Sequence, residues 1–166
     1  MMKKKNIQEI GKFVIETEAS ALSKLASNLP KDFAATIDAV LKTKGRVVVS
    51  GVGKSGHVGR KIAATLASTG TPASFVHATE ASHGDLGMIT PNDFCLLISN
   101  SGETSELYDI LAHTRRFGIL TAVISSSKNS TFVRTLNSSK SIRLSELMSI
   151  PLKNTSIIFI CNHMNK

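Results

Sequence analysis

The residues best suited to hold a small anion begin in the segment GVGKSGHVGRK. We call residues 51–56 of this segment the glycine turn. The turn carries a cation on Lys54 and a hydroxyl on Ser55 between closely spaced glycines, directly after the apolar run RVVVS. A strand that leads through such a turn into a helix aims backbone N–H groups at one spot, which suits an anion or a polar hydroxylated ligand. The structural alternative is a tight connection with a solvent-facing lysine.

Two nucleotide-binding motifs share features with the glycine turn. A P-loop needs a glycine four residues before its Gly-Lys pair, but that position is Val48, inside the predicted strand. The dinucleotide fingerprint Gly-x-Gly-x-x-Gly is formally satisfied. Its ribose-binding acid should close the next strand, where the chain has His77, with Glu80 three residues later. The P-loop thus fails on spacing, and the dinucleotide interpretation stays open as a weaker alternative.

A second candidate anion site, SNSGETSE, ends the apolar run that begins at Phe94. We call its residues 99–106 the hydroxyl loop. Four hydroxyl side chains surround Gly102 where a helix is predicted to begin: Ser99, Ser101, Thr104 and Ser105. Backbone amides and hydroxyls in this arrangement form a nest for an anion. An ordinary helix N-cap needs only one such residue, so four favour a binding role.

The segments around both loops alternate between apolar strands and amphipathic helices. Strands are predicted at 46–50, 72–76, 94–99, 119–125 and 141–145, and helices at 59–70, 105–118 and 130–137. Two more helices are predicted within residues 1–44, the second opening at Pro30. This alternation predicts an α/β fold, a doubly wound five-stranded parallel sheet with an N-terminal helical pair. Ligands of such sheets bind beyond the carboxyl ends of the strands, where both loops lie.

Composition and charge narrow the class of protein further. The 166 residues, 42% of them hydrophobic, suffice for one domain with a sizeable core. The formal net charge of +8 permits nucleic-acid binding, but the basic residues are scattered and the chain has one tyrosine, so we expect no nucleic-acid partner. No apolar run reaches transmembrane length, so we expect no membrane partner. Two distant cysteines, Cys95 and Cys161, fit a reducing cytoplasm.

Together the two loops strongly resemble those of the sugar isomerase (SIS) domain family. Three stretches carry the resemblance, GKSGH…GRK, ASHGDLGM and SNSGETSE, and it is nearly continuous from about Val47 to Val123. The first two stretches are similar to the arabinose-5-phosphate isomerase branch. The resemblance implies a flavodoxin-like sheet and a phosphosugar ligand. It also implies interconversion of ribulose 5-phosphate and arabinose 5-phosphate, the first step toward the Kdo sugar of lipopolysaccharide.

The same resemblance implies which residues meet the sugar. The positions that it assigns to phosphosugar binding are Gly53, Ser55, Ser99, Asn100, Ser101 and Thr104. The positions that it assigns to the reacting end of the sugar are Lys54, His83 and Glu106.

These residue types also fit the chemistry on their own terms. Aldose–ketose isomerisation moves a proton between adjacent carbons through an enediol, so it needs a base and a group that stabilises the developing oxyanion. Glu106 can be the base if it is partly desolvated, Lys54 can offset the negative charge, and His83 can relay a proton. The alternative for His83 is a hydrogen-bonded structural histidine, and we expect Glu103 to be solvent-exposed. The reaction needs no redox cofactor, and we expect no metal.

The resemblance weakens after the fourth predicted strand. The segment LSELMSIPLKNTSIIFICNHMNK lacks the Pro and Gly framework of the family's loop, and the long apolar helix, the His-Pro-Gly-Gly segment and the paired CBS modules do not follow. His163 lies in an unrelated context. We therefore expect N-terminal helices packed on the domain (1–44), an SIS phosphosugar-binding domain (45–145) and a divergent, truncated tail (146–166).

Two functions follow from this pattern. The complete set of Lys54, His83 and Glu106 favours an isomerase, whereas the missing C-terminal histidine favours a non-catalytic phosphosugar-binding module or a truncated remnant. In both cases we expect a homo-oligomer, because SIS domains commonly build sites with neighbouring subunits. We expect the N-terminal helices to pack on the sheet and on such a neighbour.

Overall fold

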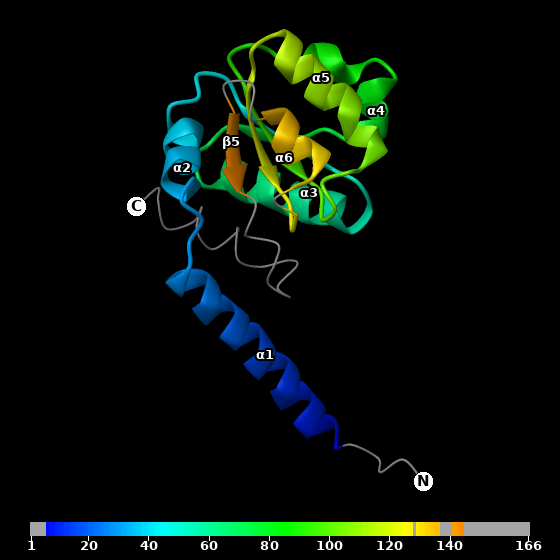
Figure 1. Ribbon diagram of the computed structural model, residues 1–166. Coiled ribbons are helices and arrows are strands. Elements are labelled where there is room, and N and C mark those ends of the chain that lie inside the picture. The colour runs from blue at the N-terminus through cyan, green and yellow to red at the C-terminus, as the bar shows by residue number, and fades with distance from the viewer. Residues whose placement is uncertain (1–5, 128, 137–140, 145–166) are drawn as a thin grey trace.

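A parallel sheet forms the centre of the computed structural model, which describes residues 6–127, 129–136 and 141–144 (Figure 1). Its strands are β1 (Val47–Gly51), β2 (Ala73–Phe75), β3 (Phe94–Ile98), β4 (Leu120–Ile124) and β5 (Ser141–Leu144). They lie in the order β2-β1-β3-β4-β5, and every neighbouring pair is parallel. The predicted α/β class with a parallel sheet is confirmed.

Helices cover both faces of this sheet. The α-helices are α1 (Ile7–Ser27), α2 (Phe33–Leu41), α3 (Gly53–Ser68), α4 (Ala78–Ser82), α5 (Tyr108–Arg116) and α6 (Thr131–Leu136). Two short 3₁₀ helices, η1 (Asp85–Met88) and η2 (Ser105–Leu107), lie in the connections. Among the described residues, no helix is both long enough and apolar enough to span a bilayer.

Alternate residues of each strand feed two separate cores. From β1, Val48 packs in the core that lies under α4, α5 and α6, whereas Val47 and Val49 pack in the core under α2 and α3. All five residues of β1 and all five of β3 are buried. Strands buried on both faces read as continuous apolar runs, and these two were visible in the sequence for that reason.

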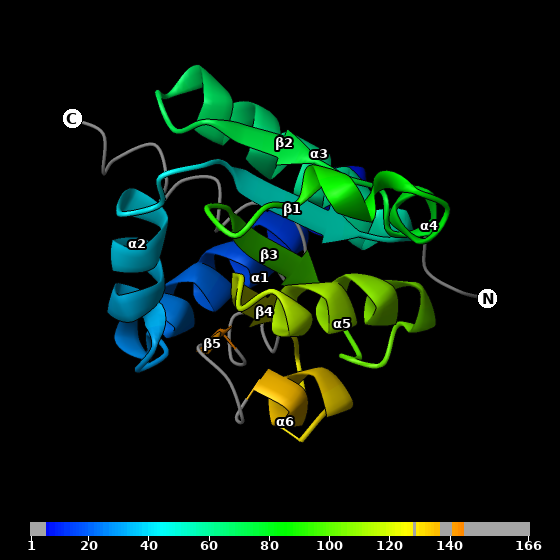
Figure 2. The same ribbon diagram turned by 90° about the horizontal axis from the view of Figure 1, so that it is seen from above.

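The strand order reverses its direction between β1 and β3. The chain runs from β1 outward to β2, then returns past β1 to β3 and continues to β4 (Figure 2). The connections that leave β1 and β3 therefore turn to opposite faces, and the space between them is where ligands of such sheets bind. Gly51 and Ile98, the last residues of β1 and β3, are paired in register. The glycine turn and the hydroxyl loop thus begin side by side.

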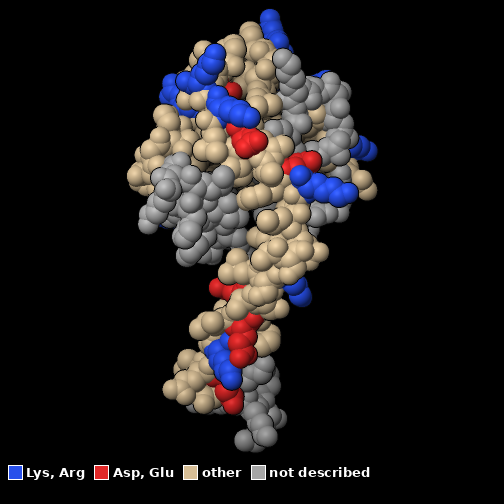
Figure 3. Space-filling view, turned by 90° about the vertical axis from the view of Figure 1, so that its left-hand side faces the viewer, with Lys and Arg blue, Asp and Glu red and all other residues tan. Residues whose placement is uncertain are grey.

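The N-terminal helices differ from the expected packing. Helix α2 contributes Phe33, Ala39 and Val40 to a core, but only Ala21 and Leu25 of α1 are buried. The rest of α1 projects away from the sheet, and its surface shows acidic and basic side chains side by side, among them the pair Lys12–Glu16 (Figures 1 and 3). The prediction that both helices pack on the domain therefore fails for most of α1.

Several boundaries also depart from the sequence-based prediction. Helix α3 begins at Gly53 rather than residue 59, so most of the glycine turn is already helical. Helix α4 and η1 were not predicted, since five and four residues are too few to show a helical period. The predicted tail, 146–166, lies outside the described residues.

Candidate functional site

The glycines of the glycine turn bring α3 close against the sheet. A Cβ atom on Gly56 would stand 2.8 Å from the carbonyl oxygen of Gly51, and one on Gly51 would stand 3.1 Å from the carbonyl oxygen of Ile98. Backbone atoms cannot yield as a flexible side chain can, so both positions exclude larger residues. Gly53 differs, because it has a positive φ of 56° but open space around it. The turn is thus packed on its inner side and open on its outer side.

The predicted ligand residues of the glycine turn lie on that first helical turn. Lys54 is exposed and Ser55 is half-buried. The ion pairs among the described residues are Lys12–Glu16 and Lys42–Asp38, so the Lys54 ammonium group has no carboxylate partner there. A helix N-terminus with a free cation and hydroxyl can receive an anionic ligand.

The hydroxyl loop is ordered by its own side chains. The buried Ser99 hydroxyl accepts the N–H of Gly102 at 2.9 Å and shares a hydrogen with the Thr104 hydroxyl, at 2.7 Å between oxygens. The Ser101 hydroxyl accepts the N–H of Glu103 at 3.1 Å. Some of the hydroxyls predicted to meet a ligand therefore already hold the loop in shape. Ser101 and Asn100 are exposed, and Thr104 is half-buried.

The connection between β4 and α6, which follows Ile124 and precedes Thr131, is hydrogen-bonded to the hydroxyl loop. The carbonyl oxygen of Asn100 accepts two hydrogen bonds from Ser126, one from its backbone N–H at 3.1 Å and one from its hydroxyl at 2.6 Å. The carbonyl oxygen of Gly102 accepts the N–H of Phe132 at 3.3 Å. Gly102 has a φ of 68°, and a Cβ atom there would collide with the side chain of Ser130. The serines of this connection had not been singled out in the sequence.

The predicted catalytic side chains come from three different elements. Lys54 lies in α3, His83 is the C-cap of α4, and Glu106 lies in η2. Helix α4 and η2 share one core, in which Ala78 and Leu107 are buried, so His83 and Glu106 belong to elements that pack together. Both side chains are exposed. The imidazole of His83 forms no hydrogen bond with the described residues, so the alternative of a hydrogen-bonded structural histidine gains no support.

The electrostatic setting of Glu106 does not meet the condition stated above for a base. The pKa of its carboxyl lies below the usual value, mainly because the carboxylate accepts the backbone N–H of Glu106 itself. The Ser105 hydroxyl, which donates to Oε2 at 2.9 Å, and the nearby His77 lower this pKa further. A base at this position requires a partly desolvated carboxylate, for which the pKa would rise. In the ligand-free site the carboxylate is exposed and is a weaker base than an ordinary glutamate.

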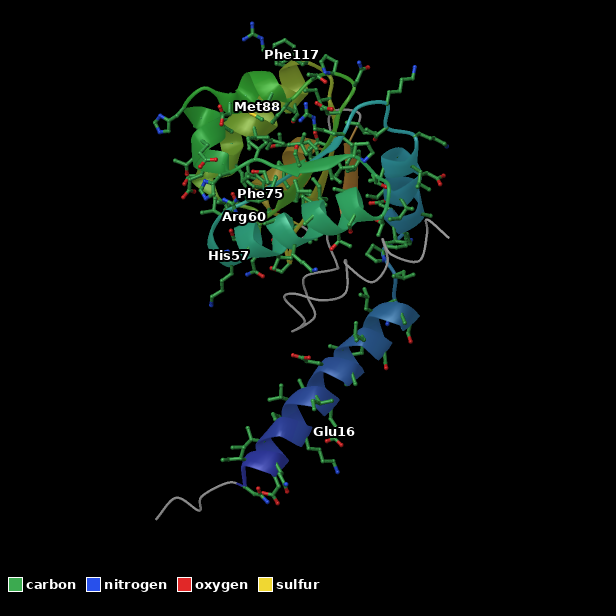
Figure 4. All side chains as sticks on the ribbon, turned by 180° about the vertical axis from the view of Figure 1, so that it is seen from behind. Glu16, His57, Arg60, Phe75, Met88 and Phe117 are labelled. Carbon is green, nitrogen blue, oxygen red and sulfur yellow. The ribbon has the colours of Figure 1, made fainter. Side chains whose placement is uncertain are left out.

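His77 is a neighbour of the site that the sequence prediction did not assign to it. Its Nδ1 atom accepts the N–H of Thr79 at 3.3 Å, as the N-cap of α4. The ring of Phe75 meets it edge-on at 6.4 Å, and Arg60 stacks on the same phenyl ring at 4.3 Å (Figure 4). A histidine that directly follows a parallel strand was the available signal.

Two further chemical classes find no support among the described residues. These residues hold no group of three or more His, Cys, Asp or Glu side chains that could ligate a metal ion. The thiol of Cys95 is buried in β3, and burial raises its pKa to about 12, so it is unsuited to nucleophilic chemistry. The chemistry available at the site is that of hydroxyls, amides, imidazoles, an ammonium group and carboxylates.

Comparison with known proteins shows which family this chain resembles. Residues 40–138 match the family model of the SIS domain. The arabinose 5-phosphate isomerase KdsD of Yersinia pestis is 51% identical over 126 residues, which are 76% of this chain and 38% of the relative. The KdsD of Pseudomonas aeruginosa is 55% identical over 105 residues, 63% of this chain and 32% of the relative. The chain thus spans less than half the length of these curated relatives.

A solved structure resembles the whole described fold. The protein c3406 of Escherichia coli CFT073, in complex with arabinose 5-phosphate, has a TM-score of 0.79 and 32% sequence identity. The alignment covers 97% of this chain and 88% of that one.

Proposed function

Since the chain belongs to the SIS domain family, we propose that it binds a pentose 5-phosphate and interconverts ribulose 5-phosphate and arabinose 5-phosphate. The observation that carries the proposal is the meeting of the glycine turn and the hydroxyl loop at the carboxyl ends of β1 and β3. A phosphate group needs several donors from different elements, and these two loops supply hydroxyls and backbone amides. The relatives named KdsD and the sugar-phosphate complex of c3406 support the choice of pentose.

The proposed binding contacts follow from the exposure of each group. The phosphate is received by Ser55 and Ser101, by the amide of Asn100 and by the Thr104 hydroxyl, with Gly53 letting the backbone approach. The buried hydroxyl of Ser99 acts mainly by holding Gly102 and Thr104 in place. This arrangement is largely formed before the ligand arrives, which reduces the entropy lost on binding.

The proposed reaction is a proton transfer along the sugar. A base removes the proton from the carbon beside the carbonyl group, the electron pair forms an enediolate, and the proton returns to the former carbonyl carbon. Glu106 is the proposed base, Lys54 stabilises the enediolate oxygen, and His83 moves the proton between the two oxygens. Glu106 is a weak base in the ligand-free site, so the bound sugar must desolvate its carboxylate for this role.

The second candidate is a binding module without turnover. The lowered pKa and the exposure of Glu106 favour it, because both oppose general-base catalysis near neutral pH. The test is proton exchange between arabinose 5-phosphate and deuterated water, followed by NMR on the purified chain. Exchange that is lost in Lys54→Ala supports the isomerase. Binding without exchange in the parent protein supports the module, and absence of binding overturns both.

We further propose that the apolar side of α1 packs against a second copy of the chain. On one side of α1, Ile7 is 84% exposed, Ile10 45% and Phe13 68%, and a contiguous exposed apolar surface of this kind marks a site of association. Light scattering of the parent protein and of Phe13→Ser decides this, with a smaller particle expected for the variant. A monomeric parent at micromolar concentration contradicts the proposal.

The compartment that we propose is the cytoplasm. The free, buried thiol of Cys95 is compatible with a reducing environment.

A further inference from the structure

The side chain of Glu103 joins the hydroxyl loop to two helices, α5 and α6. Its Oε1 atom accepts the backbone N–H of Thr131, the first residue of α6, at 2.7 Å. Its Oε2 atom accepts the hydroxyl of Tyr108, the first residue of α5, at 3.1 Å. A residue that the sequence marked only as exposed is therefore a link between the loop and two helices.

The link to α6 is reinforced by the backbone on either side of it. The next N–H of α6, that of Phe132, donates to the carbonyl oxygen of Gly102, so two successive amides of α6 bind two successive residues of the loop. The ring of Phe132 also packs edge-on against Tyr108, at 5.0 Å between centroids. Helices α5 and α6 thus hold the loop at one point, and the Glu103 carboxylate is the polar group that binds both of them.

The position of Glu103, beside the first N–H group of α6, favours a carboxylate over a neutral side chain. The first N–H groups of a helix have no partner within the helix, and a negative charge beside them is stabilised. The Thr131 N–H and then the Thr131 side chain hold the pKa of the Glu103 carboxyl below its usual value, with smaller effects from Tyr108 and Arg134. The side chain is therefore ionised at neutral pH, and its two oxygens point at two donors.

We propose that Glu103 is a positioning residue that sets the affinity of the site for the sugar phosphate by fixing the hydroxyl loop to α6. This proposal rests on the proposed function of the site. The N–H of Glu103 is held by the Ser101 hydroxyl, so a shift of Glu103 displaces that hydroxyl and the amides beside it. Glu103 itself does not move protons; that role is assigned to Glu106, three residues later.

Thr131 offers a matched partner for the test. Proline is tolerated at the first position of a helix, and it removes the one N–H that Glu103 binds there. Ser130 keeps its own capping contact, since its hydroxyl accepts the N–H of Val133 at 3.4 Å. Thr131→Pro therefore deletes the donor of this hydrogen bond, and Glu103→Ala deletes the acceptor. Together with the double variant they form a double-mutant cycle, which measures the coupling between the two residues.

The experiment measures arabinose 5-phosphate binding by calorimetry for the full chain and these variants. Loss of a hydrogen bond to a charged group, discounted for solvent exposure, predicts binding about three- to tenfold weaker in each single variant. The double variant should bind no more weakly than Glu103→Ala alone. Glu103→Gln, which can still accept one N–H and meet the Tyr108 oxygen, should recover part of the affinity. Glu16→Ala, on the projecting part of α1, is the control and should bind like the parent.

Two further measurements separate positioning from general stability and from the proposed function. In steady-state kinetics the variants should raise KM and leave kcat within about twofold, as expected when binding to ground and transition state falls equally. Hydrogen exchange of the ligand-free chain should speed up at residues 101–103 and not in β1.

Each outcome has one meaning. Parental affinity in Glu103→Ala, or additive losses in the double variant, overturns the positioning role. Failure of the parent chain to bind any pentose phosphate overturns the proposed function instead. In that case hydrogen exchange still tests the positioning role: if exchange at residues 101–103 is the same in Glu103→Ala as in the parent, Glu103 does not fix the loop to α6.

Discussion

The two loops at the centre of the site are built on opposite principles. In the glycine turn, Lys54 and Ser55 lie on the first turn of α3, and neither side chain forms a hydrogen bond or ion pair with the described residues. In the hydroxyl loop, Ser99, Ser101 and Glu103 are all engaged in hydrogen bonds with the loop or its neighbours. One loop presents free groups on a rigid helix, and the other uses its own groups to hold its shape.

This difference suggests a division of labour. Preorganised donors bind an anion without the cost of ordering them. An ammonium group that is not neutralised by a carboxylate of the protein can stabilise the negative charge that develops during the reaction. The hydroxyl loop is therefore expected to govern affinity and the glycine turn to govern reactivity. Glu106 is the exception, since it lies in the hydroxyl loop but is proposed to react.

The largest expected effect concerns this exception. Glu106→Gln keeps the size of the side chain but cannot accept the substrate proton, so turnover should fall by about 10² to 10⁴-fold while binding is retained. The measurement is kcat for arabinose 5-phosphate together with calorimetric affinity.

The control for this change is Glu16→Gln on α1, which should leave turnover unchanged. Glu103→Gln is unsuitable as a neutral control because its carboxylate accepts two hydrogen bonds. Full turnover in Glu106→Gln would show that the base is another residue.

A pair of glycine substitutions compares the packing of the two loops directly. Gly102 and Gly53 both have positive φ, but only Gly102 is enclosed, since a Cβ atom there would stand 2.8 Å from the Ser125 hydroxyl oxygen. Gly102→Ala should lower the free energy of unfolding by about 2 to 4 kcal/mol, from backbone strain plus collision. Gly53→Ala should lower it by about 1 to 2 kcal/mol, from strain alone. Urea denaturation measures both, and equal losses would contradict the difference in packing.

A smaller effect is expected from one hydroxyl of the hydroxyl loop. Ser101→Ala should weaken pentose 5-phosphate binding by about 1 to 2 kcal/mol, the value of one hydrogen bond to a charged group. Calorimetry with ATP and NAD is the control, and neither should bind, because the glycine turn lacks P-loop spacing and an acid that holds ribose. Tight binding of either nucleotide would reverse the assignment.

The smallest effect concerns pH. The pKa of Glu106 lies below its usual 4.5 in the ligand-free chain, mainly through its own backbone N–H. A carboxyl with a lowered pKa stays ionised down to that pKa, so the acid limb of kcat/KM, which reports the free enzyme, should lie below pH 4.5. An acid limb near neutral pH would contradict the assignment of Glu106 as the group whose ionisation the reaction requires.

The sequence by itself determined the parts of the molecule that depend on local pattern. The buried runs of β1 and β3, the glycines between β1 and α3, and the clustered hydroxyls after β3 were all recognisable, because burial on both faces and tight backbone approach restrict which residue types fit. Those restrictions predicted the parallel sheet and placed two candidate loops at its carboxyl edge.

Tertiary structure alone decided which groups those loops meet. The sequence gives no sign that Glu103 reaches the N–H of Thr131, 28 positions away, or that His77 lies near Glu106. It also predicted packing for the apolar side of α1, whereas the fold carries most of that helix away from the sheet. Such outcomes depend on how separate elements are set against one another. An amphipathic pattern predicts that the apolar side of a helix packs against something, but contacts between distant segments decide what that partner is.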